Sequence, residues 1–81
     1  MESTNQTTLD LVGVKNRIQV VEIRGGWGVR QRLSQLGIHP GDIMIIKRSG
    51  IFGGPLVVNV HNTDVALGRG MAKKVIVQLL S

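Results

Sequence analysis

The stretch RGGWGVRQRL, Arg24 to Leu33, is the part of the chain most open to a nucleotide-binding interpretation. A glycine-rich turn that leads into a helix can bind phosphate, because unpaired backbone N–H groups and the helix dipole point at the anion. A Walker loop, however, ends in Gly-Lys-Ser/Thr, and here Gly28 is followed by Val29 and Arg30. A dinucleotide-binding fingerprint needs a longer helix that crosses back to a parallel strand. The glycines therefore predict a turn between a strand and a short helix.

The two histidines and the acidic residues do not form a pattern typical of catalysis or of tight metal binding. No spacing aligns a nucleophile, a base and an orienting group. His39 with Asp42, or His61 with Asp64, offers at most two hard ligands, whereas a closed structural metal site normally has four. Glu22 fits a charge on a strand surface, and Asp42 fits a turn residue. We therefore expect solvated histidines in a protein that is not an enzyme and holds no metal or cofactor.

Length and composition limit the class of protein further. Eighty-one residues allow one domain, and a chain of this size buries only about 60% of the surface that its unfolded form exposes. Because there is no cysteine, neither a disulfide framework nor a thiolate metal site can form. No apolar run reaches the roughly 18 residues of a membrane span, and MESTNQTT lacks the regions of a signal peptide. We expect a small cytoplasmic protein.

The elements that position these residues follow from the apolar pattern. Residues 1–8 are polar and without periodicity, and they predict a disordered tail before a single domain at residues 9–81. In Arg17–Ile23 the alternation slips once, at residues 20–21, which indicates either a β-bulge or burial of both faces. The residues Ile43–Ile46 are too densely apolar for a one-sided strand and indicate a central barrel strand.

The helix after the glycines can be predicted in more detail. Val29, Leu33 and Leu36 stand at i, i+4 and i+7 and form one apolar stripe, so Leu33 and Leu36 should be buried. Gly37 should end the helix with a positive φ, and Ile38 should then be buried where it could contact Leu33.

The rest of the chain predicts further short strands separated by turns. The sequence HPGD at residues 39–42 favours a type II turn, with proline and glycine at its centre. The glycine-rich loop SGIFGGP at residues 49–55 precedes two alternating segments that predict a hairpin around residues 62–63. A kink at residues 68–72 leads into a last strand at Lys74–Leu80. Five short strands and one short inserted helix indicate a small, mainly β barrel.

Three motifs in this order carry a family resemblance: LSQLGIHPGD, then GGPLVVNV, then DVALGRGMAKKVIV. Together they resemble the FeoA domain, a small cytoplasmic component of bacterial ferrous iron uptake, over nearly the whole chain from Leu9. The resemblance implies an SH3-like five-stranded barrel with a short inserted helix, in which the segment Arg24–Leu33 is the turn into that helix. It also implies an accessory protein for FeoB, a membrane transporter with a cytoplasmic GTP-binding domain. Related domains form the C-terminal module of iron-dependent repressors, behind a DNA-binding domain.

Three apolar residues in glycine-rich surroundings are candidates for partner contact. Trp27 either packs on the barrel or stands out as a binding anchor, and packing is favoured because the core has only two aromatic residues to use. Ile51 and Phe52 either plug the end of the barrel or form an exposed tip. With the basic residues around them, the predicted contact residues are Ile51, Phe52, Trp27, Arg30, Arg32, Lys47 and Arg48.

Two functional classes fit a net charge of +5, which suggests an acidic partner. In the first, the domain regulates a FeoB-like membrane GTPase transporter by protein contact, with an anionic membrane surface as a further partner. In the second, a small basic barrel binds nucleic acid. Barrels that bind single strands rely on aromatic side chains for stacking, and this chain offers only Trp27 and Phe52. The shortage of aromatic residues favours protein contact.

Overall fold

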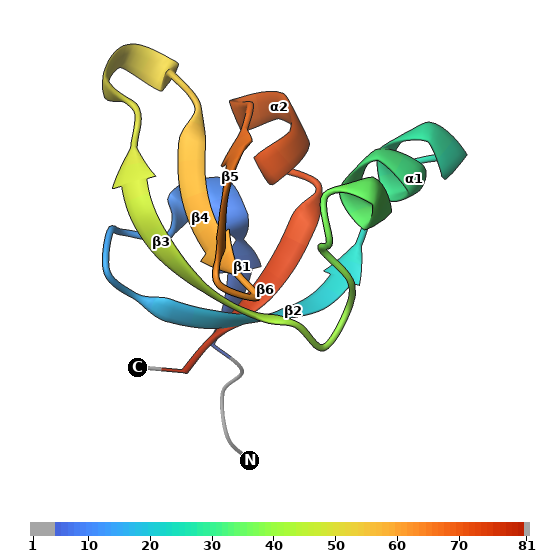
Figure 1. Ribbon diagram of the computed structural model, residues 1–81, viewed down its shortest axis with the longest axis horizontal. Coiled ribbons are helices and arrows are strands. Elements are labelled where there is room, and N and C mark those ends of the chain that lie inside the picture. Colours follow the sequence, from blue (N-terminus) through green and yellow to red (C-terminus); the bar gives the residue numbers. More distant parts are fainter. Residues whose placement is uncertain (1–4, 81) are drawn as a thin grey trace.

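The structure is a computed structural model that describes residues 5–80, except for the side chain of Ile51. A curled antiparallel sheet surrounds the core, with α1 to one side and a projecting loop at the opposite corner (Figure 1). The elements in chain order are β1 (Gln6–Thr8), η1 (Leu9–Leu11), β2 (Arg17–Ile23), α1 (Trp27–Gln35), β3 (Ile43–Ser49), η2 (Ile51–Gly53), β4 (Leu56–Val60), β5 (Thr63–Leu67), α2 (Arg69–Ala72) and β6 (Val75–Leu79).

The six strands pair in the order β1-β6-β2-β3-β4-β5, and every pairing is antiparallel. The predicted small, mainly β fold with a short helix inserted after the first long strand is confirmed. The strand count and the closure differ from the prediction. There are six strands rather than five, and within residues 5–80 the edge strands β1 and β5 do not pair with each other, so the sheet is not closed.

The additional strand corrects the predicted disordered tail at residues 1–8. Residues 6–8 form β1, in which Thr7 lies opposite Val77 of β6 and Thr8 opposite Ile76; residues 1–4 lie outside the described part. The Leu79 N–H also donates to the Asn5 carbonyl at 3.0 Å. A three-residue strand is too short to show periodicity, and its hydrogen bonds come from the far end of the chain. Local pattern therefore could not predict it.

The pattern of β2 and β3 was partly misread. A register shift lies between Val20 and Glu22 in the pairing of β2 with β6, so the β-bulge is confirmed. Strand β3 is central in the sheet, but only Met44 and Ile46 are buried, while Ile43 and Ile45 are exposed on the outer face. The expectation that this strand is buried on both faces is wrong.

The core fills the inner, concave side of the sheet. Its largest fully buried side chains come from every layer of the fold: Leu9, Ile18, Leu33, Ile38, Met44, Ile46 and Leu56, with five valines. Leu33 is the fully buried residue of α1, and Leu36, predicted to be buried, is partly buried against the core. No polar or charged side chain of the described residues is buried, so the polar contacts described below lie at the rim.

The end of α1 has the predicted cap. Gly37 has φ 84°, its N–H donates to the Ser34 carbonyl at 3.0 Å, and the Ile38 N–H donates to the Leu33 carbonyl at 2.9 Å. This pair of bonds is the Schellman arrangement, which requires a left-handed residue at the position of Gly37. Ile38, the next residue, is fully buried. The cap therefore turns the chain from α1 directly back into the core.

Replacing Gly37 with valine should lower the free energy of unfolding by more than about 1 kcal/mol, because a β-branched residue is strained in the left-handed region. Gly28→Ala is the matched control: Gly28 lies within α1, and an added Cβ there meets no atom within 4 Å. Alanine is favourable inside a helix, so this control should retain full stability. Urea denaturation measures both variants. Equal midpoints for Gly37→Val and the parent would contradict the assigned cap.

Candidate functional site

The predicted contact residues lie at two separate corners of the molecule. Trp27, Arg30 and Arg32 belong to α1, whereas Lys47, Arg48 and Phe52 belong to β3 and the loop that follows it. Figure 1 shows this loop and α1 on opposite sides of the upper end of the barrel. The structure therefore divides the predicted site into two surfaces.

Trp27 does not pack on the barrel, so the favoured interpretation was wrong. Its side chain is 78% exposed at the first position of α1. Successive helix residues are about 100° apart, so Trp27, two residues before Val29, lies about 200° from the apolar stripe. The outward face of α1 is a shallow hollow lined by Trp27, Arg30, Gln31, Ser34 and Gln35. Helical geometry could have predicted this exposure from the sequence.

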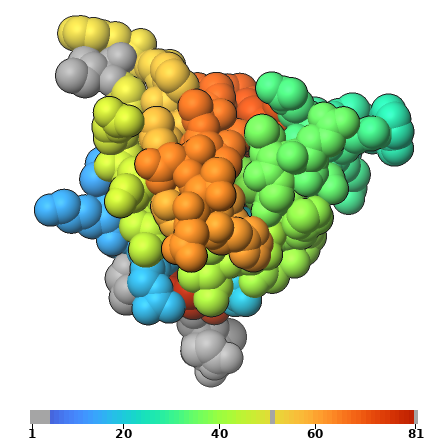
Figure 2. Space-filling view, in the orientation of Figure 1, coloured from blue at the N-terminus to red at the C-terminus, as the bar shows by residue number. Residues whose placement is uncertain are grey.

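We use the name tip loop for residues 49–55, which project beyond the barrel (Figure 2). The Gly50 N–H donates to the Pro55 carbonyl at 3.0 Å, and a Cβ on Gly50 would overlap the backbone of Gly54. The two arms of the loop therefore meet in a narrow neck that only glycine permits. Phe52, at the far end, is completely exposed and has the left-handed φ of 59°. The exposed-tip interpretation is correct for Phe52; the Ile51 side chain lies outside the described part.

Two basic side chains lie at the base of the tip loop. In the pairing of β3 with β4, the register shifts between Ile46 and Arg48, so β3 carries an additional residue at Lys47. Such a bulge interrupts the alternation of buried and exposed side chains. Lys47 and Arg48 are consequently both exposed, although they are consecutive in a strand.

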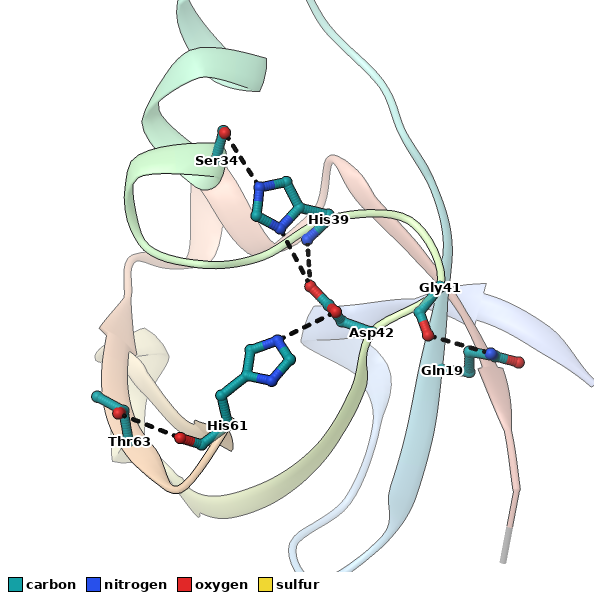
Figure 3. Close-up of polar contacts among 7 residues, drawn as sticks. All are labelled: Gln19, Ser34, His39, Gly41, Asp42, His61 and Thr63. Carbon is teal, nitrogen blue, oxygen red and sulfur yellow. Dashed lines mark hydrogen bonds and ion pairs between the residues drawn. The ribbon is translucent and has the colours of Figure 1, made fainter.

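A polar cluster that the sequence did not predict links the end of α1, the turn after it and the hairpin between β4 and β5 (Figure 3). The Asp42 carboxylate accepts the His39 backbone N–H at 2.7 Å and lies 3.3 Å from His39 Nδ1. Its other oxygen lies 3.1 Å from Nε2 of His61, and Ser34 Oγ lies 3.1 Å from Nε2 of His39. Asp42 thus connects the turn after α1 to the hairpin between β4 and β5.

The sequence predicted no contact here: it offers His39 with Asp42, and His61 with Asp64, only as possible pairs of metal ligands, and it favours solvated histidines. His39 does pair with Asp42, and the Asp42 N–H donates to the His39 carbonyl at 3.0 Å in the predicted tight turn. His61 pairs with Asp42 rather than Asp64, which accepts from the Asn59 amide at 2.8 Å. The strand register explains this pairing. Met44 of β3 lies opposite Val60 of β4, so Asp42, which precedes β3, and His61, which follows β4, come together. Predicting the cluster from the sequence would have required the register between β3 and β4.

The Asp42 carboxyl is more acidic than usual. Partial burial acts to raise the pKa of Asp42. The opposing effects are larger: hydrogen bonds from the His39 backbone, the His39 ring and the His61 ring, together with the charge attraction of His61, lower the pKa, so its net shift is downward. Each of these contacts favours the ionised carboxylate. Among residues 5–80, no group of three or more His, Cys, Asp or Glu side chains could hold a metal ion. The hydrogen bonds of Asp42 hold the turn after α1 against the β4–β5 hairpin.

Comparison with known proteins supplies the family. The model of the FeoA domain matches residues 7–79, almost the whole chain. The chain belongs to the FeoA domain family. A relative from Methanocaldococcus jannaschii, whose name describes it as a proposed Fe(2+) transport protein A, is 34% identical over 59 residues, covering 73% of this chain and 70% of the relative.

Solved structures agree with the FeoA assignment. An iron uptake regulatory protein (FeoA) is 32% identical with a TM-score of 0.85, over 93% of this chain and 97% of that chain. A FeoA-like protein from Clostridium acetobutylicum supports the fold alone, with a TM-score of 0.87 at 24% identity over 98% and 92% of the two chains. A manganese-dependent transcriptional repressor shares the fold alone, with a TM-score of 0.88 at 17% identity over 99% of this chain and 45% of the repressor. The predicted family and SH3-like fold are confirmed.

The Asp42 cluster predicts a specific acid response. Because the folded-state pKa of Asp42 is depressed, its contribution to stability is fully present above the unfolded pKa of 3.8 and is lost as the pH falls through the folded pKa. Asp42→Asn should therefore lower the melting temperature at pH 6 and flatten its decline between pH 5 and pH 2.5, roughly one unit either side of the unfolded value. Thermal unfolding at a series of pH values measures this. Parallel curves for parent and variant would show that Asp42 makes no such contribution.

The isolated protein should bind neither GTP nor ferrous iron tightly. The chain lacks the lysine and hydroxyl pair of a Walker loop, and the described residues lack a metal-ligand cluster. Isothermal titration calorimetry with each ligand should detect no stoichiometric binding, and GTP incubated with the protein should remain intact. Saturable binding of either ligand at micromolar concentration would refute this expectation.

Proposed function

We propose that this FeoA-family protein is a cytoplasmic accessory protein of ferrous iron uptake that regulates a FeoB-like membrane GTPase transporter through contact with its cytoplasmic part. The iron-transport names of two relatives support the general role. The observation that carries the contact is Phe52, an aromatic side chain completely exposed at the end of a pinched loop. Burying a phenylalanine side chain is worth about 1.5–3 kcal/mol, so this position offers binding energy that the fold itself does not use.

Charge supports an acidic partner surface. Lys47 and Arg48 lie exposed at the base of the tip loop, and they can steer the domain toward carboxylates or toward anionic lipid beside the transporter. The described acidic side chains are engaged elsewhere: Asp10 with Thr8, Glu22 with Arg24, Asp42 with the histidines and Asp64 with Asn59. Lys47 and Arg48 are therefore available to pair with acidic groups of a partner.

The alternative of a small barrel that binds nucleic acid has less support. Stacking of successive bases requires neighbouring aromatic side chains along a basic groove. Phe52 and Trp27, the two aromatic residues of the chain, belong to the tip loop and to α1, on opposite sides of the molecule (Figure 1). They cannot form one stacking track. Trp27, Arg30 and Arg32 instead remain a second proposed protein contact, on α1.

No helix among residues 5–80 is long and apolar enough to cross a membrane. Contact with the transporter would accordingly use the outer surface of the barrel. The charged residues Lys47 and Arg48 lie where an anionic membrane surface next to the transporter could also be reached, as an auxiliary partner.

Phe52→Ser should weaken binding to the purified FeoB-like transporter by more than about tenfold, because an exposed aromatic anchor typically dominates contact energy. Its melting temperature should match the parent, since the side chain contacts no core residue. Raising the salt concentration should weaken binding of the parent, because charges steer the encounter. Biolayer interferometry against the transporter in nanodiscs measures these affinities.

Trp27→Ser is the matched comparison, because it removes the other exposed aromatic residue, at the opposite corner, and so tests the second proposed contact on α1. If Trp27→Ser abolishes binding and Phe52→Ser does not, the contact lies on α1 and the tip loop must be abandoned as the site. If both variants bind like the parent and support iron transport equally, neither surface is the contact.

A further inference from the structure

One arginine holds the tip loop in place from a distant part of the chain. From α2, Arg69 Nε donates to the Gly54 carbonyl at 3.0 Å, and Nη2 donates to the Ser49 hydroxyl at 2.8 Å and to the Gly50 carbonyl at 3.0 Å. Its Nη1 donates to the carbonyl of Asp10 in η1 at 3.0 Å. A single partly buried guanidinium thus joins α2, η1 and both sides of the neck of the tip loop.

The acceptors indicate that this arginine acts by geometry rather than by charge pairing. Three of them are backbone carbonyls and the fourth is a hydroxyl, and no ion pair of Arg69 is found within residues 5–80. A guanidinium presents five N–H donors in a rigid plane, which lets it reach segments in different directions at once. A lysine ammonium carries its three N–H donors on one nitrogen atom, so at the same place it could not bond to all four acceptors.

The loop that Arg69 holds is in a strained conformation. Phe52 has φ 59° and ψ 36°, a left-handed conformation that is unfavourable for a residue other than glycine. Such conformations persist only where the surroundings impose them, and they gather at functional positions. Here the surroundings are the Gly50–Gly54 neck and the bonds from Arg69 to both of these glycines.

Additional exposed residues lie on segments that are bonded to Arg69 or to β3. Leu11 follows directly after Asp10, whose carbonyl Arg69 binds, and its side chain is 72% exposed. The Lys15 N–H donates to the Ile46 carbonyl at 2.8 Å, which places another exposed basic residue beside Lys47. Bonds from one guanidinium to the Asp10 and Gly50 carbonyls therefore hold the backbones of η1 and the tip loop close together.

We propose that η1 and the tip loop form one composite contact surface, with Phe52 and Leu11 as apolar anchors and Lys15, Lys47 and Arg48 as its basic rim, and that Arg69 is its positioning residue. The partner chemistry that fits is an apolar socket flanked by carboxylates on a protein surface. This inference rests on the proposed contact with the transporter and deepens it. A loop already fixed in its binding conformation loses less conformational entropy when it binds, so losing Arg69 should weaken the complex.

The test is a double-substitution cycle on transporter binding. Arg69→Met removes the four bonds and the charge, Arg69→Lys keeps the charge, and Lys73→Met, at an exposed residue after α2, controls for the loss of one positive charge. Both Arg69 variants should weaken binding by about tenfold through lost preorganisation, and Lys73→Met by less than about threefold. In the Phe52→Ser background, Arg69→Met should have little further effect, because coupled residues are not additive.

Hydrogen exchange provides a readout that does not depend on the partner. In Arg69→Met and Arg69→Lys, the Gly50 amide, bonded to Pro55 in the parent, should exchange faster, while core amides such as Val58 and Val77 keep their protection. Leu11→Ser tests the second segment, and it should weaken binding without changing the melting temperature. If Arg69→Met does not fold, Arg69→Lys and Ser49→Ala carry the test.

Several outcomes would overturn the composite surface while leaving the proposed function intact. If Phe52→Ser loses binding but the Arg69 variants bind like the parent, Arg69 does not position the loop. If Arg69→Met weakens binding equally with and without Phe52, its effect is not transmitted through the loop. If Leu11→Ser binds normally, η1 is not part of the surface. Normal binding by Phe52→Ser itself would instead refute the proposed contact site.

Discussion

The constraint on which the structure depends is the need to fill one small concave core with the apolar side chains of only 81 residues. The inner face of the curled sheet supplies most of that core, and Leu9, Leu33 and Ala72 close it from η1, α1 and α2. A domain of this size has little apolar surface to spare, so a large aromatic side chain left in water is apolar area that the core does not use. Phe52 and Trp27 are such side chains.

Around this core, polar side chains determine how the loops are held. Arg69 fixes the tip loop and η1 at one end, and Asp42 fixes the turn after α1 to the β4–β5 hairpin at another. Both groups lie at the rim, where water and protein compete as partners, and both connect segments far apart in sequence. The barrel is thus a rigid support on which short loops are displayed in defined conformations, which is the usual arrangement for binding functions.

The sequence was sufficient wherever the determining interaction is local. The Gly37 cap, the bulge of β2 and the tight turn before β3 follow from residues within a few positions, and all three are confirmed. Strand β1, the pairing of His61 with Asp42 and the four bonds of Arg69 depend on contacts between distant segments, and local pattern gave no sign of them. Trp27 is an intermediate case, because its helical position opposite Val29 predicts exposure, but the scarcity of aromatic residues favoured burial.

Site-specific photo-crosslinking in membranes tests most directly whether the tip loop contacts the transporter. A benzophenone side chain at position 52, with a second preparation carrying it at position 27, would be irradiated in cells that produce the FeoB-like transporter. We expect a covalent adduct between position 52 and the cytoplasmic part of the transporter. Adducts from position 27 alone, or adducts of position 52 only with other proteins, would contradict it.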